Sequence, residues 1–250
     1  MKYCMSGRQP ISILKKVNEV RMHYADKDRI IDYIEALPDK TIILEIPKEA
    51  SINWDLYKAY ASKVDFILCL ADLATAQQCK SNGIKFFWGY PINTYYELQS
   101  LLKLEPCYLY LGAPLCFDLP RVKEITDIPI RLIPNVAYDG YIPRDNGVCG
   151  QWIRPEDVNE YEKYVDVLEF DTNELQREAV LLHVYKDTQK WMGNLNLLIT
   201  NLGVDVDNRA ISSDLVKARV SCGQRCMSHG TCHLCLYALK YSPEVAKSPV

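Results

Sequence analysis

The sequence lacks several features that would assign it to a broad class at once. It contains no apolar run approaching the roughly 18 residues that a membrane helix needs. Its first residues, MKYCMSGRQPISILKK, lack the apolar core of a secretory signal. No Gly-rich phosphate loop of the G-x-G-x-x-G or Walker type is present, and no internal repeat is found. These absences predict a cytoplasmic protein with no membrane partner.

An excess of charge of one sign is also missing. The chain has 29 basic and 32 acidic residues and a net charge of -3, which predicts no nucleic-acid partner. Hydrophobic residues make up 48% and charged residues 24%, as is ordinary for a globular protein. We therefore expect a small-molecule or peptide substrate as the partner, while the oligomeric state is left open.

Short apolar runs alternate with helical segments along most of the chain. KDRIIDYIEALPD, for example, places isoleucines and a leucine at helical spacing. Eight such strand–helix units in series predict a compact (β/α)8 barrel of the TIM type, and an open doubly wound sheet is the alternative. The predicted strands are residues 19–25, 41–47, 65–71, 85–91, 107–114, 128–136, 147–153 and 165–171, followed by a helix over 174–202.

Polar side chains lie at or just after the ends of several predicted strands. Barrels of this class bind their ligands at the carboxyl ends of the strands, so these side chains are the candidates for chemistry. The predicted catalytic residues are Glu45, Asp72, Asn135, Arg154 and Glu169.

His23 and Arg21 sit late in the first predicted strand and are expected near Glu45 and Glu169. Two carboxylates beside a histidine can perform acid–base catalysis or hold a cation. The structural alternative is that Arg131 and a glutamate form a paired ionic layer inside the barrel. A buried charge is costly unless it is paired, which is why this alternative stays open.

Four of the ten cysteines crowd into one segment near the end of the chain. Cys222, Cys226, Cys232 and Cys235 follow the pattern C-x3-C-x5-C-x2-C. Two short-spaced pairs of thiolates suit a zinc ion or an iron–sulfur cluster, and a reducing cytosol disfavours disulfides. The intervening residues are too polar to form a core, so the metal would supply the folding energy. We therefore predict a barrel domain over 1–202 and a cysteine-rich metal-binding segment over 203–250, with disulfides or free thiols as alternatives.

Other side chains are candidates for the same metal or for separate chemistry. His229 and His233 lie within the cysteine segment, and Cys116 and Cys149 lie on the predicted loop face of the barrel. Cys149 also precedes a predicted helix, where a thiol has a lowered pKa and can act as a nucleophile. The remaining scattered cysteines are predicted to be small buried hydrophobes: Cys4, Cys69, Cys79 and Cys107.

The segments YLGAPLCFDLPRVKEI and IPNVA, together with the cysteine-rich element, resemble the peptidase U32 group. The resemblance covers about residues 40–175. It implies a barrel related to collagenase-like peptidases and to iron–sulfur proteins that assist hydroxylation in ubiquinone synthesis or RNA modification. The cysteines of that group are more widely spread than residues 222–235, so no catalytic residue is carried over.

Two functions follow from these observations. The first is a metal-containing barrel enzyme that acts on a small or peptide-like substrate by hydrolysis or by iron–sulfur-assisted redox chemistry. The second is a non-catalytic scaffold, such as an assembly or virion component, in which the metal is structural. The fold alone does not decide between them, because barrels host many functions.

Overall fold

A computed structural model describes residues 1–92, 94–111, 118–136, 151–170, 175–187, 190–192, 208–210 and 220. The chain divides into two compact units. The first comprises residues 1–112, 128–132 and 165–179, and the second comprises residues 113–127, 133–164 and 180–250. The predicted boundary between residues 202 and 203 lies outside the described residues.

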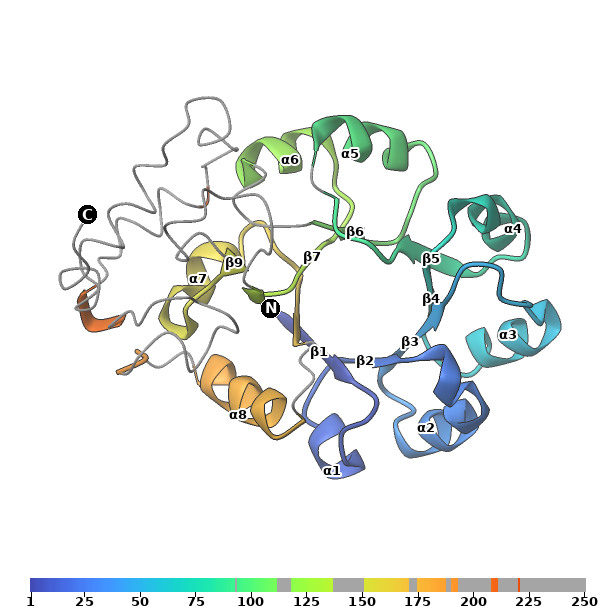
Figure 1. Cartoon of the computed structure of the whole chain (residues 1–250), viewed down its shortest axis with the longest axis horizontal. Coiled ribbons are helices and arrows are strands. Elements are labelled where there is room, and N and C mark those ends of the chain that lie inside the picture. Colours follow the sequence, from blue (N-terminus) through green and yellow to red (C-terminus); the bar gives the residue numbers. More distant parts are fainter. Residues whose placement is uncertain are drawn as a thin grey trace, which may run out of the picture. The chain divides into compact units, whose positions relative to one another are not determined.

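The first unit is an eight-stranded parallel β-barrel (Figure 1). Neighbouring strands follow the order β5-β4-β3-β2-β1-β10-β7-β6. Parallel bridges from Phe87 to Tyr108 and from Ile92 to Leu111 close the ring between β5 and β6. The strands are β1 (Lys2–Ser6), β2 (Glu19–Met22), β3 (Thr41–Ile46), β4 (Phe66–Leu70), β5 (Lys85–Trp88), β6 (Leu109–Tyr110), β7 (Ile130–Leu132) and β10 (Val167–Phe170). The predicted (β/α)8 fold is confirmed.

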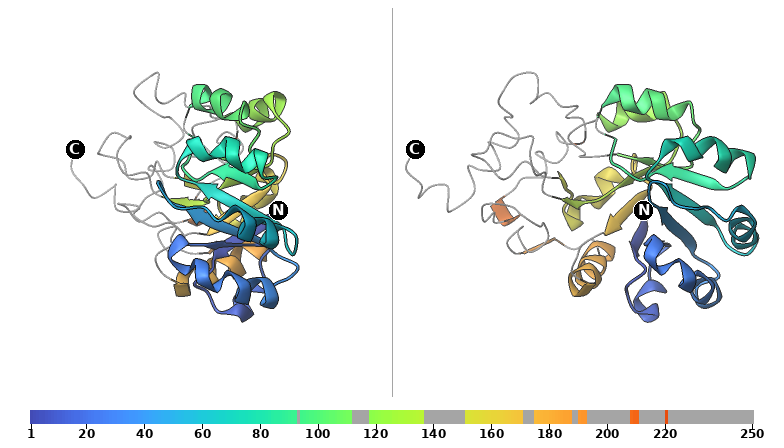
Figure 2. Two further views of the ribbon diagram at one scale, coloured as in Figure 1. Left: turned by 90° about the vertical axis from the view of Figure 1, so that its right-hand side faces the viewer. Right: turned by 45° about the vertical axis from the view of Figure 1, so that its right-hand side comes forward.

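Helices connect the strands on the outside of this ring, as the first five helices show (Figure 2). They are α1 (Ile11–Leu14), α2 (Ile30–Ala36), α3 (Trp54–Ala61), α4 (Ala76–Ser81) and α5 (Tyr95–Leu102). Helix α3 packs on β4 through aromatic side chains. The ring centres of Tyr57 and Tyr60 each lie 5.6 Å from that of Phe66 on β4. Helix α5 begins with a capping box between Thr94 and Glu97, which satisfies backbone N–H groups at its first turn.

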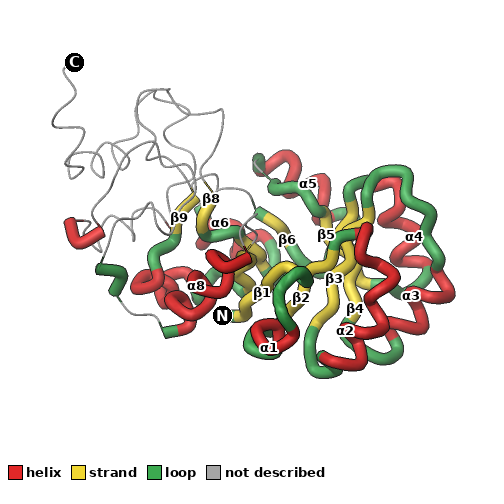
Figure 3. The backbone as a smooth tube through the Cα atoms, turned by 60° about the horizontal axis from the view of Figure 1, so that its bottom comes forward, coloured by secondary structure: helices red, strands yellow, loops and turns green. Residues whose placement is uncertain are grey.

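The second unit contributes further helices and a β-hairpin (Figure 3). Its helices are α6 (Leu119–Ile125) and α7 (Val158–Tyr161), and α8 (Leu175–Lys186) begins in the first unit and continues into the second. Strands β8 (Asn135–Val136) and β9 (Gln151–Trp152) pair antiparallel. None of the helices in the described part of the chain has the length and apolar character needed to cross a membrane.

Two of the predicted strands require correction. The run 147–153 was expected in the barrel, but its described part forms β9 of the antiparallel hairpin. The barrel position is instead taken by β1, which was not predicted because KYCMS contains one residue of high strand propensity, Tyr3. The predicted strand 128–136 ends early, because Pro134 has no N–H to continue the ladder and its carbonyl accepts the Ile153 N–H at 3.0 Å.

The turn after β5 depends on a glycine. A methyl group at Gly89 would lie 2.7 Å from Cys69 Sγ and 3.3 Å from the Leu70 carbonyl oxygen. We expect Gly89→Ala to lower the free energy of unfolding by about 1–3 kcal/mol, as overpacking of a core does. Urea denaturation would measure the change.

Cys69→Ala is the matched partner for that variant, since it removes the clashing sulfur. The double variant should lose less stability than the sum of the two single variants. Gly83→Ala is the control, because Gly83 has a φ of +67° and nothing within 4 Å of an added methyl. The stability that Gly83→Ala loses comes from its backbone conformation, so adding Cys69→Ala should leave that loss unchanged. Strict additivity of Gly89→Ala with Cys69→Ala would contradict the steric explanation.

Candidate functional site

Small residues on β1 open the interior of the barrel to long charged side chains. Cys4 lies in register with Glu19 on β2 and with Glu169 on β10, and Ser6 lies in register with Arg21. Neighbours in register on parallel strands point to the same face of the sheet. Because Cys4 and Ser6 are small, the Arg21 side chain passes them and pairs with Glu169, although β1 separates their strands.

Arg131 is the centre of the buried part of this network. Its side chain is fully buried and pairs with Glu19 through Nη2 and with Glu169 through Nη1, the latter at 2.6 Å. The Tyr108 hydroxyl donates to Glu19 at 2.6 Å. The guanidinium carbon lies 5.0 Å from the ring centre of Phe87 and 4.9 Å from that of Tyr108. The predicted ionic layer around Arg131 is confirmed, with carboxylates on two sides and aromatic rings beside it.

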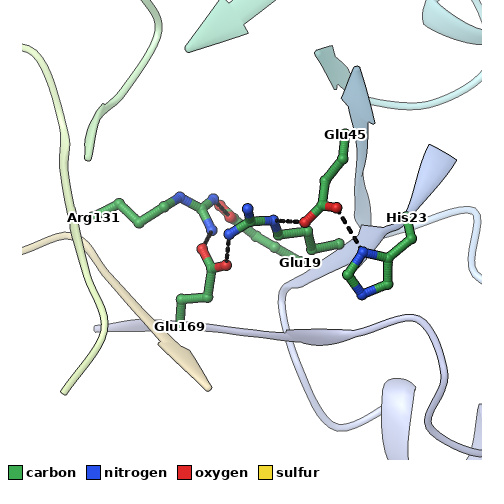
Figure 4. A network of polar contacts seen from close by, with 6 residues as sticks. Glu19, His23, Glu45, Arg131 and Glu169 are labelled. Carbon is green, nitrogen blue, oxygen red and sulfur yellow. Dashed lines mark hydrogen bonds and ion pairs between the residues drawn. The ribbon is translucent and has the colours of Figure 1, made fainter. Parts of the chain in front are cut away.

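The network continues from the buried layer towards the carboxyl ends of the strands (Figure 4). Arg21 pairs with Glu169 through Nη1 and with Glu45 through Nε, the latter at 2.6 Å. The other oxygen of Glu45 lies 2.6 Å from His23 Nδ1. Exposure rises along this chain, from 1% for the Glu169 side chain to 23% for Glu45 and 34% for His23. The network therefore joins a dry interior to a histidine that solvent reaches.

Burial and neighbouring charges shift the pKa of Glu169 in opposite directions. Burial alone would raise the pKa of its carboxyl, but the guanidinium groups of Arg21 and Arg131 hold the pKa below its ordinary value of 4.5. The thiol of Cys69 faces the same interior, and burial raises its pKa to about 12. Glu169 is thus an anion and Cys69 a neutral thiol at neutral pH.

A small pocket lies at the exposed end of the network. It is lined by Ser6, Arg21, His23, Glu45, Glu169 and Phe170. Ser6 ends β1, His23 follows β2, and Glu45 and Glu169 lie one residue before the ends of β3 and β10. The pocket is therefore at the carboxyl ends of the strands, where barrels bind ligands. Its volume of about 10 Å³ admits roughly one water-sized group.

The structure brings together two of the five predicted catalytic residues. Glu45 and Glu169 line the same pocket and share Arg21. Asp72 instead precedes the 3-10 helix η2 (Leu73–Thr75), where its side chain accepts the Ala74 N–H at 3.0 Å. Asn135 lies on β8 in the second unit, not on a barrel strand.

Arg154 also belongs to the second unit and has a structural environment there. It precedes the 3-10 helix η4 (Pro155–Asp157) and its Nη2 donates to Asp157 Oδ1 at 2.8 Å. Its Nη1 lies 3.3 Å from Asn208 Oδ1, and Asn208 in turn donates to Glu156 at 2.6 Å and to the Trp191 carbonyl at 2.8 Å. Arg154 is 2% exposed and ties together three segments of the chain.

The metal-binding prediction falls on undescribed residues. Cys222, Cys226, Cys232 and Cys235 lie outside the described ranges, as do Cys116, Cys149, His229 and His233. Among the residues that are described, no group of three or more His, Cys, Asp or Glu is placed to hold a metal ion. Cys4, Cys69 and Cys79 are buried free thiols, as predicted, and Cys107 is half-buried.

The sequence reasoning missed Glu19 and Ser6. A usable signal was present for Glu19, because it alternates with Arg21 and His23 along one strand and all three therefore share the interior face. Ser6 was missed because β1 itself was not predicted.

The comparisons with known proteins do not assign a family. The chain matches no protein-family model and no curated protein. Among solved structures it is similar to a thiamine phosphate pyrophosphorylase from Pyrococcus furiosus, with 12% identity and a TM-score of 0.34. The match covers 74% of this chain and 95% of that one. The fold assignment rests on the strand order, and the resemblance to the peptidase U32 group stays a prediction.

The depressed pKa of Glu169 leads to a prediction for acid conditions. A carboxyl whose pKa is lower in the folded state stabilises the fold above its unfolded pKa, and this contribution is lost as pH falls through the folded pKa. We expect the Glu169 carboxyl to remain ionised at pH 4.5, its ordinary pKa. Carbon-detected NMR of labelled glutamate carboxyls would follow it. A titration midpoint above that value would contradict the ion pairs described here.

Proposed function

We propose that the chain is a barrel enzyme in which His23 and Glu45 perform acid–base catalysis on a small or peptide-like substrate. One observation carries the proposal: the 2.6 Å contact between His23 Nδ1 and Glu45 Oε2 at the carboxyl ends of the strands. A carboxylate bound to Nδ1 favours the tautomer in which Nδ1 carries the proton. The other ring nitrogen, Nε2, is then free to accept one.

Hydrolysis is the reaction that this pair serves most directly. Nε2 of His23 would take a proton from a water molecule as the water oxygen attacks a carbonyl carbon of the substrate. Glu45 would stabilise the imidazolium that forms, and the imidazolium would return the proton to the leaving group. Arg21 holds Glu45 through its other oxygen and thus orients the pair. Iron–sulfur-assisted redox chemistry is the other reaction class proposed.

The test of this function is a panel of small esters, amides and short peptides assayed with purified full-length protein. Turnover of at least one of these substrates by the wild type, lost in His23→Gln, is expected if His23 is the base. Absence of turnover across the panel, with folded protein confirmed by circular dichroism, would argue against hydrolysis.

A metal centre on Cys222, Cys226, Cys232 and Cys235 is the second part of the proposal, supported by their spacing. Protein purified without oxygen should contain either zinc, without colour, or iron and sulfide, with a brown colour that bleaches in air. We expect Cys232→Ser to lose the metal and to loosen the chain from about residue 205 onward, because metal binding supplies the folding energy there. Cys79→Ser is the control, since Cys79 is buried on α4 and should not alter metal content. Equal metal content in the two variants would contradict the assignment.

A scaffold with a structural metal is the second candidate function. It is favoured by the small volume of the pocket, about 10 Å³, and by the pairing of each of the charged side chains in the barrel network. Such pairing is what an ionic core that serves only stability requires.

A further inference from the structure

The charges of the barrel network do not balance when His23 is neutral. In the described part of the chain, the network joins three carboxylates, those of Glu19, Glu45 and Glu169, to two guanidinium groups, those of Arg21 and Arg131. The net charge of these five groups is one negative charge. Because the groups are largely withdrawn from water, this charge is poorly screened. The network therefore favours one additional positive charge at its exposed end.

The position of that charge is defined by the pocket. Both guanidinium groups are paired with carboxylates. Glu45 and Glu169 line the pocket, and each carboxylate oxygen has a second lone pair beyond its present contact. The Ser6 hydroxyl, which accepts the Arg8 N–H at 3.3 Å, lies at the same wall. The pocket thus presents hydrogen-bond acceptors to whatever enters it.

The size of the pocket restricts which positively charged group can bind there. A volume of about 10 Å³ holds one water-sized group. A primary ammonium group has this size, carries a positive charge and offers three hydrogen-bond donors. A guanidinium or a quaternary ammonium group is too large, and a phosphate or carboxylate has the wrong charge.

We propose that this pocket binds the primary ammonium group of an amine or amino-terminal peptide substrate. The proposal rests on the proposed function and names its substrate class. The ammonium group compensates the negative charge of the network, and Glu45, which contacts His23, is one of its acceptors.

Calorimetric titration of the full-length protein with methylammonium chloride tests the proposal, with sodium chloride replaced at constant ionic strength. We expect saturable binding of methylammonium at neutral pH. Tetramethylammonium and inorganic phosphate should not bind. Equal heats from tetramethylammonium, or saturable binding of phosphate at this pocket, would overturn the proposal. Tighter binding of glycinamide than of methylammonium would identify peptide amino termini as the source of the group, and equal binding would identify simple amines.

Variants separate this inference from the proposed function. Glu45→Gln should weaken methylammonium binding by roughly tenfold or more, the value of one charge-assisted hydrogen bond. Glu35→Gln, the same change on the exposed face of α2, should leave the affinity unchanged. His23→Gln should retain binding, because the acceptors of the ammonium group are the carboxylates. A His23→Gln variant that binds methylammonium and keeps full turnover would refute the proposed function alone, while an active wild type that binds no methylammonium would refute the inference alone.

Discussion

Replacing Arg131 by methionine is expected to lower the free energy of unfolding by about 3–5 kcal/mol, because it removes one partner from a buried ionic cluster. Glu19 would lose its ion-pair partner while its side chain remains 0% exposed. Glu169 would keep only Arg21. The uncompensated carboxylates, rather than the lost attraction itself, account for most of this cost. Equilibrium unfolding in guanidinium chloride at neutral pH would measure it.

Two further variants make the Arg131 experiment specific. Arg29→Met removes an exposed guanidinium that lies 5.4 Å from the Tyr33 ring, and should cost about 1 kcal/mol or less. Adding Glu19→Gln to Arg131→Met should recover part of the lost stability, since the neutral amide no longer needs a buried cation. If the double variant is no more stable than Arg131→Met, the loss comes from packing and not from the orphaned charge.

Replacing His23 by glutamine is expected to lower kcat by roughly 10²–10⁴-fold on any substrate that the wild type turns over, as loss of a general base does. Stability should change little, because the His23 side chain is 34% exposed and its ion-pair partner among the described residues is a partly exposed carboxylate. The measurement is kcat and KM with and without the substitution, together with unfolding curves.

His183→Gln is the matched control for that variant. His183 lies on α8 with a side chain that is 79% exposed and should leave the rate unchanged. An exogenous imidazole at high concentration should partly restore the rate of a His23 variant if a proton acceptor is what was lost. A His23→Gln protein with normal kcat would exclude this residue from the chemistry and would favour the scaffold.

The fold was predictable because parallel strands buried on both faces appear as apolar runs between helical segments. β3, with the sequence TIILEI, and β4, with FILCL, carry this signal clearly. β1 did not, since KYCMS has an apolar run of three residues and one residue of high strand propensity, Tyr3. The residues of β8 and β9 were predicted as parts of barrel strands, because a short apolar run does not reveal which strand it will pair with.

The site was predictable in part for the same reason. Alternation along a strand places Glu45 and Glu169 on the interior face, and the barrel brings the ends of their strands to one mouth. What alternation does not reveal is which side chains are paired. The reach of Arg21 across β1 depends on Ser6 being small, and Arg154 contacts Asn208, which lies 54 residues away in the sequence. Such distant contacts leave no local pattern in the sequence.

The position of β1 between β2 and β10 has a consequence for how the chain is made on the ribosome. Lys2 pairs with Val167, so one edge of β1 waits for a strand that is synthesised very late. Glu19 likewise waits for Arg131, which lies 112 residues further on. At about 5–20 residues per second, that interval is roughly 6–20 s. During it, the early strands present an open sheet edge and an unneutralised carboxylate to the solvent. We expect the nascent chain to remain a ligand for chaperones until β10 emerges and closes the ring.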